Sequence, residues 1–270
     1  MKHPVPAVAE RPADEAGRLN LLSCNILAGG SVRRYRDYVT HSWKHVLPTG
    51  KRANLDVLAR VIGEFDLVGL QEADAGSLRS GFLNQTQYLA EAAAFPFWSH
   101  QPNRRVSRLA TSSNGLLARM QPDEVLDYPL PGRIPGRGAL WARFGEGEHS
   151  LVVVIAHLSL GPAARMRQLG FIAELLGHHP NVVLMGDLNT PPGSAELKML
   201  YSKTALEPPH ESPATFPSWR PTRAIDHILV SGAITVERRW ALSHPVSDHL
   251  PVAASIVLPS TLGAGARKPA

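Results

Sequence analysis

An aspartate and an asparagine stand two residues apart at the end of an apolar segment, in Val182-Val183-Leu184-Met185-Gly186-Asp187-Leu188-Asn189. Alternate residues of a strand face the same side, so Asp187 and Asn189 are expected to enter one site. The pair offers one ionisable oxygen acceptor, or base, and one neutral amide that can donate to a phosphoryl oxygen or ligate a metal. This combination suits phosphoester chemistry.

Other apolar segments of the chain also end in a polar residue that would be costly to bury without a partner. Taken singly, each has an ordinary explanation, because an asparagine after a strand is usually a turn residue and a lone histidine is more often structural. Their order and local context carry more information than any one of them. These residues are Asn25, Glu72, His157, Asp226, Asp248 and His249.

Taken together, these residues resemble the motifs of the endonuclease/exonuclease/phosphatase superfamily. This group includes DNase I-like nucleases, abasic-site endonucleases, neutral sphingomyelinases, inositol-polyphosphate phosphatases and deadenylases. The specific elements are Gly186-Asp187-Leu188-Asn189 and Ser247-Asp248-His249-Leu250-Pro251, and the resemblance covers residues 20–258. It implies an α/β fold, a DNase I-like four-layer α/β/β/α sandwich in which two mixed β-sheets pack face to face with helices outside.

The resemblance also implies a role for each motif residue. Glu72 would be the principal ligand of a Mg²⁺ or Mn²⁺ ion, with Asn25 and Asp248 nearby, because hard divalent cations prefer oxygen ligands. Asp187 would orient or deprotonate the attacking water. Asn189 would hold a nonbridging phosphate oxygen.

The two motif histidines would transfer protons or stabilise negative charge on the phosphate. His249 would be the general base or would stabilise the phosphate charge, and Asp226 would hold it in one tautomer. His157 would donate to the phosphate or protonate the leaving group. Hydrolysis of a phosphoester anion needs a cation on the phosphoryl oxygens, an activated in-line water and an acid for the departing oxygen. The motif residues supply all three.

Further residues are candidates for binding substrate. Asn114, in Ser113-Asn114-Gly115-Leu116, resembles an Asn-Gly that precedes a strand in many members of the superfamily, and Arg137 stands in another recurring strand start. A simple turn before a strand explains either equally well. Arg165, on a helix that follows His157, could reach a phosphate or a headgroup, or could be a surface cation.

Local departures separate the chain from two branches of the superfamily. Leu27 stands where the abasic-site branch commonly has an acidic residue, and His157-Leu158 stands where that branch has Tyr-x-Pro-Asn. No counterpart of the lysine- and arginine-rich motif of the inositol phosphatases lies between Asn189 and His249. The His-Leu form looks more like the sphingomyelinase, deadenylase and DNase I-like branches, and like small bacterial intracellular metal-dependent hydrolases.

We therefore expect a divalent-metal-dependent phosphoester hydrolase, a phosphodiesterase of nuclease or phospholipid-headgroup type in which an activated water attacks in line. The alternative is a catalytically silent phosphate- or nucleic-acid-binding module with the same fold, against which the intact Glu72, Asp187 and His249 argue. The partner would be a phosphoester substrate, either a nucleic acid or a phospholipid headgroup. A net charge of +5 favours a polyanion without choosing between them.

Length and composition indicate one domain, since 270 residues with 44% hydrophobic content can bury a large core. We expect this domain over residues 18–260, with disordered tails at 1–17 and 261–270. No apolar run reaches the about 20 residues that span a bilayer, and no secretory signal precedes the domain. The single cysteine, Cys24, lies in an apolar strand pattern. These features predict a cytoplasmic protein and say nothing of its oligomeric state.

Apolar periodicity predicts strands interspersed with helices. Two stretches, 29–50 and 99–113, are expected to be long loops whose cations could carry function. Strands 225–231 and 234–240 are expected to pair as a hairpin across Gly232. The other expected strands cover 19–27, 67–71, 115–119, 125–128, 139–144, 150–156, 182–187 and 251–258, and helices cover 54–64, 84–94, 163–176 and 194–200.

Overall fold

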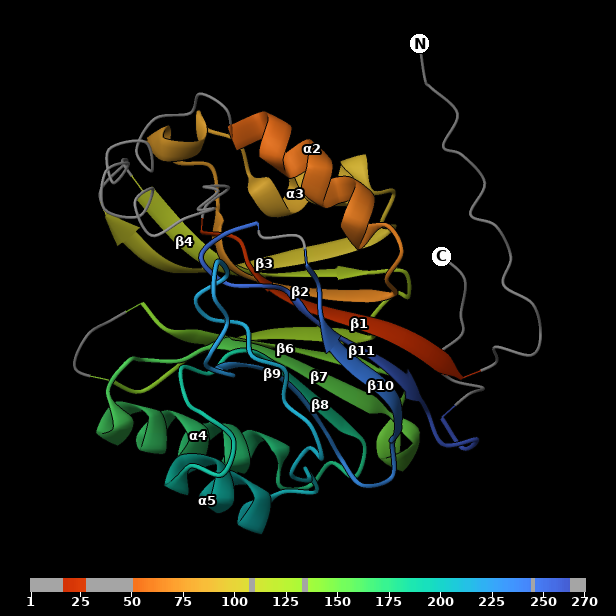
Figure 1. The fold of residues 1–270 in the computed structure, drawn as a ribbon. Helices are drawn as coiled ribbons and strands as arrows, with labels where there is room; N and C mark the ends of the chain where they lie inside the picture. Colours follow the sequence, from red (N-terminus) through yellow and green to blue (C-terminus); the bar gives the residue numbers. More distant parts are fainter. Residues whose placement is uncertain (1–16, 28–50, 107–109, 133–135, 244–245, 263–270) are drawn as a thin grey trace.

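Two β-sheets lie face to face at the centre of the molecule, with helices on both outer faces (Figure 1). The computed structural model describes residues 17–27, 51–106, 110–132, 136–243 and 246–262. This arrangement confirms the expected α/β/β/α sandwich. The expected N-terminal tail, apart from Gly17, and the loop at 29–50 lie outside the described residues.

The first sheet has the strand order β10-β11-β1-β2-β4-β3. Strands β1 and β2 are parallel, and Asn25 pairs with Gln71. The carboxyl ends of both strands therefore reach the same edge, with Asn25 beside the residue that precedes Glu72. The strands of this sheet are β1 (Arg18–Asn25), β2 (Leu67–Asp74), β3 (Phe97–Val106), β4 (Ala110–Ala118), β10 (Thr235–Ala241) and β11 (Val252–Val257).

The second sheet has the strand order β5-β6-β7-β8-β9. Its register sets three polar residues side by side: His157 pairs with Asp187 across β7 and β8, and Asp187 pairs with Asp226 across β8 and β9. The strands are β5 (Glu124–Pro129), β6 (Gly138–Phe144), β7 (Leu151–His157), β8 (Val182–Asp187) and β9 (Asp226–Val230).

Helices α2 (Lys51–Ile62) and α3 (Gln85–Ala92) cover the first sheet, and α4 (Pro162–Leu176) and α5 (Ala195–Lys203) cover the second. Short 3₁₀ turns stand at η4 (Leu78–Ser80) and η5 (Gly147–His149). Asn84 and Ser194 cap α3 and α5 through their side chains, which accept from backbone N–H groups of the first turn. Among the described residues, no helix is long and apolar enough to cross a membrane.

Apolar side chains fill three layers, one between the sheets and one under each pair of helices. Along β1 the alternation of a strand divides them: Leu21 packs between the sheets, whereas Leu22 and Cys24 pack beneath α2 and α3. Leu262 is also buried between the sheets, so the folded part of the chain continues past the expected boundary at 260. Residues 263–270 lie outside the described part.

Two expectations about local structure are wrong. The stretch expected as a loop over 99–113 contains most of β3 and the start of β4. Because β3 is an edge strand of its sheet, it tolerates Pro102 and a polar composition. These features are typical of loops, so the sequence did not indicate a strand. The strands on either side of Gly232 do not form a hairpin, because β9 pairs with β8 and β10 pairs with β11 in the other sheet.

Candidate active site

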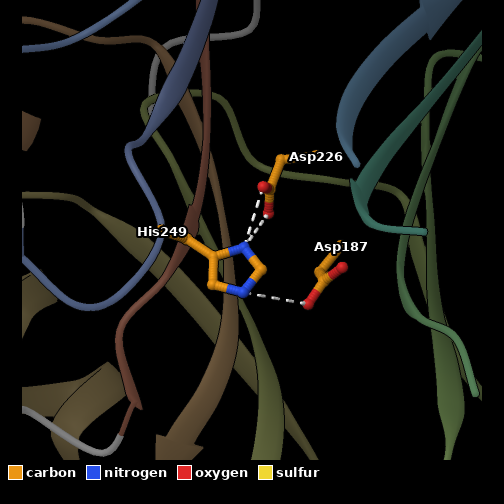
Figure 2. Close-up of side chains that lie close together, drawn as sticks. All are labelled: Asp187, Asp226 and His249. Atoms are coloured by element: carbon orange, nitrogen blue, oxygen red, sulfur yellow. Dashed lines mark hydrogen bonds and ion pairs between the residues drawn. The ribbon is translucent and has the colours of Figure 1, made fainter. Parts of the chain in front are cut away.

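The polar residues at the strand termini meet at one edge of the sandwich, where the two sheets face each other. The first sheet contributes Asn25 and Glu72, and the second contributes three residues at the ends of β7, β8 and β9. The loop before β11 adds Asp248 and His249. Figure 2 shows the group at its centre, Asp187, Asp226 and His249.

The carboxylate of Asp187 lies at the centre of this site and contacts four other residues of it. Its Oδ2 accepts a hydrogen bond from Asn25 Nδ2 at 3.2 Å and lies 3.4 Å from His157 Nε2 and 3.9 Å from His249 Nε2. Its Oδ1 accepts from the backbone N–H of Asn189 at 3.1 Å. Burial raises the pKa of Asp187 to about 7, and the nearby charge of Asp226 adds to this shift. A carboxylate in this state can take up a proton near neutral pH.

Gly186 explains how Asp187 comes so close to β7. Its φ of +149° lies in a region that residues with a side chain rarely adopt, and a Cβ at this position would stand 1.8 Å from the carbonyl oxygen of Ala156. Only glycine allows this close approach of the two strands. The glycine before Asp187 is therefore part of the geometry that brings Asp187 beside His157.

His249 is paired with Asp226. Its Nδ1 lies 3.0 Å and 2.8 Å from the two carboxylate oxygens, so Nδ1 carries a proton and Nε2 turns toward Asp187 (Figure 2). Burial alone would lower the pKa of His249, but the hydrogen bond and charge of Asp226, with Asp187 and Asp248 nearby, raise it to about 9. The imidazole is therefore a cation at neutral pH.

His157 is in the opposite state. Burial lowers the pKa of His157 well below its usual value, and the positive charges of Arg137 and His249 act in the same direction. The ring is therefore neutral at neutral pH, with Nε2 between Asp187 and Glu72, whose Oε1 is 3.9 Å away. A neutral imidazole at this point can donate one hydrogen bond to a substrate oxygen.

Glu72 is turned into the site by an irregularity of β2. The register between β2 and β4 shifts between Leu70 and Ala73, and Glu72 adopts a φ of +58°, which is uncommon for a residue with a side chain. Its side chain is 30% exposed. Desolvation by the surrounding protein nevertheless raises the pKa of Glu72, and the charge of Asp248 acts in the same direction.

The donor set fits a hard divalent cation. The carboxyl groups of Glu72 and Asp248 are close enough for Asp248 to raise the pKa of Glu72, and Glu72 in turn raises that of Asp187. A divalent cation among these oxygens would relieve the repulsion. Asp187, Asp226 and His249 also offer ligand atoms within 4.8 Å of one another, but the hydrogen bonds between His249 and Asp226 account for that group without an ion.

Ser247 and Asn189 fix the loops that carry the site. The Ser247 hydroxyl donates to the carbonyl oxygen of Asn25 at 2.6 Å and accepts from the backbone N–H of His249 at 3.0 Å, so Ser247 has a structural role in this turn. The Asn189 side chain donates from Nδ2 to the carbonyl oxygen of Leu158 at 3.0 Å. An amide has further hydrogen-bonding capacity, which leaves Asn189 able to meet a phosphate oxygen.

Comparison with known proteins places these residues in a family. The sequence profile of the Endonuclease/Exonuclease/phosphatase family matches residues 22–249. The chain belongs to this family. Its name joins enzymes that hydrolyse phosphoester bonds. Among curated proteins, none matches the sequence.

Solved structures share the endonuclease/exonuclease/phosphatase fold at low identity. A family member from Beutenbergia cavernae has a TM-score of 0.70 and 20% identity, covering 90% of this chain and 72% of its own. A mannosyl-6-phosphatase from Bacteroides thetaiotaomicron has a TM-score of 0.64 and 20% identity, covering 89% and 100%. TDP2 from D. rerio, complexed with a single-stranded DNA product, has a TM-score of 0.62 and 16% identity, covering 88% and 98%. These likenesses establish a shared fold.

Asn114 is a buried contact between the two sheets. Its side chain is completely buried, and Nδ2 donates to the carbonyl oxygens of Gly138 at 2.8 Å and Ile155 at 3.4 Å and to Gln101 Oε1 at 3.2 Å. Asn114 therefore ties β4 of one sheet to β6 and β7 of the other. These contacts give Asn114 a structural role between the sheets.

Arg165 is also occupied away from the site. Its Nε and Nη2 donate to Glu196 Oε1 at 3.1 Å and 2.9 Å, and its Nη1 donates to the carbonyl oxygen of Leu160. Both charged side chains are buried, at 11% and 8% exposed. This ion pair joins α4 to α5, so the structure does not support the expectation that Arg165 binds substrate.

Two further groups act on residues of the site, of which the first had only a strand-start motif as its signal in the sequence and the second had no signal. Arg137, at the start of β6, acts on both Glu72 and His157 through its charge. The segment before β9 brings Thr215 and Phe216 against Asp226 and His249. The Arg137-Gly138 strand start was a signal for the first group, whereas Thr215 and Phe216 stand in no pattern that indicates chemistry.

Proposed function

We propose that the protein is a divalent-metal-dependent phosphoester hydrolase, and specifically a phosphodiesterase of nuclease or phospholipid-headgroup type. One observation carries the proposal. The Nε2 atoms of His157 and His249 face the same oxygen of Asp187, at 3.4 Å and 3.9 Å, while the pKa of one ring is lowered and that of the other is raised. The proton acceptor Asp187 therefore has a neutral hydrogen-bond donor, His157, and a cation, His249, beside the same carboxylate oxygen.

Glu72, with Asn25 and Asp248 nearby, would hold a Mg²⁺ or Mn²⁺ ion. When bound, such an ion supplies positive charge to the phosphoryl oxygens and makes water easier to deprotonate. Arg137 would add a fixed charge on the side of Glu72 and His157. Membership of the family supports this part of the proposal, as does the mutual repulsion of the carboxyl groups.

Side chains of the protein carry out proton transfer and stabilise the charge that develops. Asp187 orients the attacking water and accepts its proton as the oxygen bonds to phosphorus. His249, a cation held by Asp226, faces the developing charge and can give its Nε2 proton to the departing oxygen as the phosphorus–oxygen bond breaks. His157 and Asn189 donate hydrogen bonds to nonbridging oxygens.

The described residues offer features for both substrate classes. For a lipid, Leu160 and Phe82 are 75% and 67% exposed, in segments that follow strands of the site, whereas Leu130 is buried. For a nucleic acid, Trp98 and Trp219 are partly exposed aromatic residues. Three further apolar or aromatic residues, Ile134, Tyr35 and Trp43, lie outside the described residues.

A hydrolysis panel tests the proposal. The wild type and Asp187→Ala would be assayed with Mg²⁺, with Mn²⁺ and with excess chelator on plasmid DNA, single-stranded DNA, RNA, sphingomyelin, glycerophospholipid and bis-p-nitrophenyl phosphate. We expect metal-dependent cleavage of one class that is absent in the variant and in chelator. Metal binding without turnover of any substrate would favour the silent binding module.

A further inference from the structure

A hairpin formed by residues 215–223 packs against the catalytic pair from outside the motifs. It lies between α5 and β9, and its two arms are joined by hydrogen bonds between Phe216 and Arg223, from each backbone N–H to the other's carbonyl oxygen, at 3.0 Å and 2.9 Å. The N–H of Thr215 also donates to Arg223 at 2.9 Å. The base of the hairpin is therefore a fixed element.

The hairpin holds the backbone on both sides of His249. The N–H of Ser218 donates to the carbonyl oxygen of Asp248 at 2.7 Å, and its hydroxyl donates to that of Ser247 at 2.8 Å. On the other side, the N–H of Leu250 donates to the carbonyl oxygen of Thr215 at 2.9 Å. The loop from the first sheet is thereby fastened to the segment that leads into β9 of the second.

Thr215 also acts on Asp226 through its side chain. The residue is completely buried, and its hydroxyl donates to Asp226 Oδ2. Both oxygens of Asp226 face Nδ1 of His249, at 3.0 Å and 2.8 Å. The Thr215 hydroxyl gives Asp226 a second donor besides Nδ1 of His249 and so further restrains the orientation of the carboxylate.

Phe216 holds the imidazole from another direction. Its ring centroid lies 4.9 Å from that of His249, at an interplanar angle of 52°. The guanidinium of Arg223 lies 5.6 Å from the same aromatic centroid. Phe216 is therefore packed between these two groups and supports the imidazole of His249.

We propose that Thr215 is a positioning residue, which acts through Asp226 to keep Nε2 of His249 directed at Asp187. The kinetic part of this inference rests on the proposed function, because it needs a reaction to measure. The structural part does not, because the Nδ1–H of His249 has a proton signal of its own. The two parts can therefore fail separately.

The first test compares two substitutions at one position. Thr215→Val removes the hydroxyl and keeps the shape, whereas Thr215→Ser keeps the hydroxyl. We expect Thr215→Val to lower kcat by on the order of tenfold to a hundredfold with KM changed less than about twofold, and Thr215→Ser to restore most of the rate. Thr222→Val, an exposed position on the same hairpin, is the matched control and should behave as wild type.

The second test uses proton NMR of the metal-free protein. The wild type and Thr215→Ser should show a low-field signal from the His249 Nδ1–H, assigned by its loss in His249→Ala, and Thr215→Val should broaden or shift it. An unchanged signal and rate in folded Thr215→Val would overturn the inference, as would a Thr215→Ser protein as slow as Thr215→Val. If the wild type cleaves nothing while the signal still depends on Thr215, the proposed function fails and the positioning role stands.

Discussion

The side-chain amide of Asn25 donates to Oδ2 of Asp187 at 3.2 Å and joins residues 162 positions apart in the sequence. Asn25 ends β1 in one sheet, and Asp187 ends β8 in the other. The centre of the site is therefore assembled only when the sheets are packed on each other. The apolar layer between the sheets, which includes Leu67 and Met185, is in this sense part of the active site.

Removing the charge of Asp187 should change how stability depends on pH. The pKa of Asp187 is about 7 in the folded protein and ~3.9 in an unfolded chain, so the folded state binds the extra proton over this interval. The free energy of unfolding of the metal-free wild type should therefore fall as pH rises from ~4 toward 7. Asp187→Asn lacks this loss, so its stability relative to wild type should be greater at pH ~8 than at pH ~5.

Urea unfolding in chelator at the two pH values measures this difference. Glu64→Gln, at an exposed position after α2, is the control for changing a carboxylate to an amide. A gap between Asp187→Asn and wild type that stays constant with pH would show that burial does not hold the Asp187 carboxyl group in its protonated form.

Replacing Glu72 with Gln should weaken divalent-metal binding. The substitution keeps the size of the side chain and removes one anionic oxygen ligand, so we expect the affinity for Mn²⁺ to fall by at least about tenfold. Isothermal titration calorimetry measures the change. Glu174→Gln, at an exposed position of α4, provides the control, and an equal affinity in the Glu72 variant would remove Glu72 from the ligand set.

Much of the site could be predicted because the end of an apolar strand is a local feature that the sequence records. The apolar run of β8 is buried throughout and ends in Gly186 and Asp187, so the position of the polar residue followed from the pattern. The same holds for His157 at the end of β7. Parallel pairing of β7 with β8, which the local pattern does not record, then brings the two residues together.

The remaining features depend on partners that the sequence does not mark. Arg165 resembles a surface cation until Glu196, 31 positions away, is placed beside it. Edge strand β3 tolerates a polar composition because it has a neighbouring strand along only one of its two edges. The change of sheet between β9 and β10 is decided by which strand offers a free edge, and periodicity along one segment contains no such information.

His249→Ala should lower turnover far more than substrate binding. The imidazole is directed at the reacting centre by Asp226, and its charge matters most as the phosphoryl group changes, so we expect kcat to fall by about 10²–10⁴-fold. Steady-state kinetics and an equilibrium binding measurement separate the two effects. His178→Ala, at an exposed position, serves as the control, and a full rate in His249→Ala would show that the role given to His249 is wrong.

The buried pair of Arg165 and Glu196 should affect stability and leave catalysis unchanged. Removing one partner strands a buried charge, so Arg165→Ala should lower the free energy of unfolding by about 3–5 kcal/mol. The double replacement Arg165→Met with Glu196→Met should cost less, because it strands no charge. Urea unfolding gives these values, and kcat/KM per folded molecule should match wild type in both. A raised KM in a stable double variant would instead show that Arg165 contributes to substrate binding.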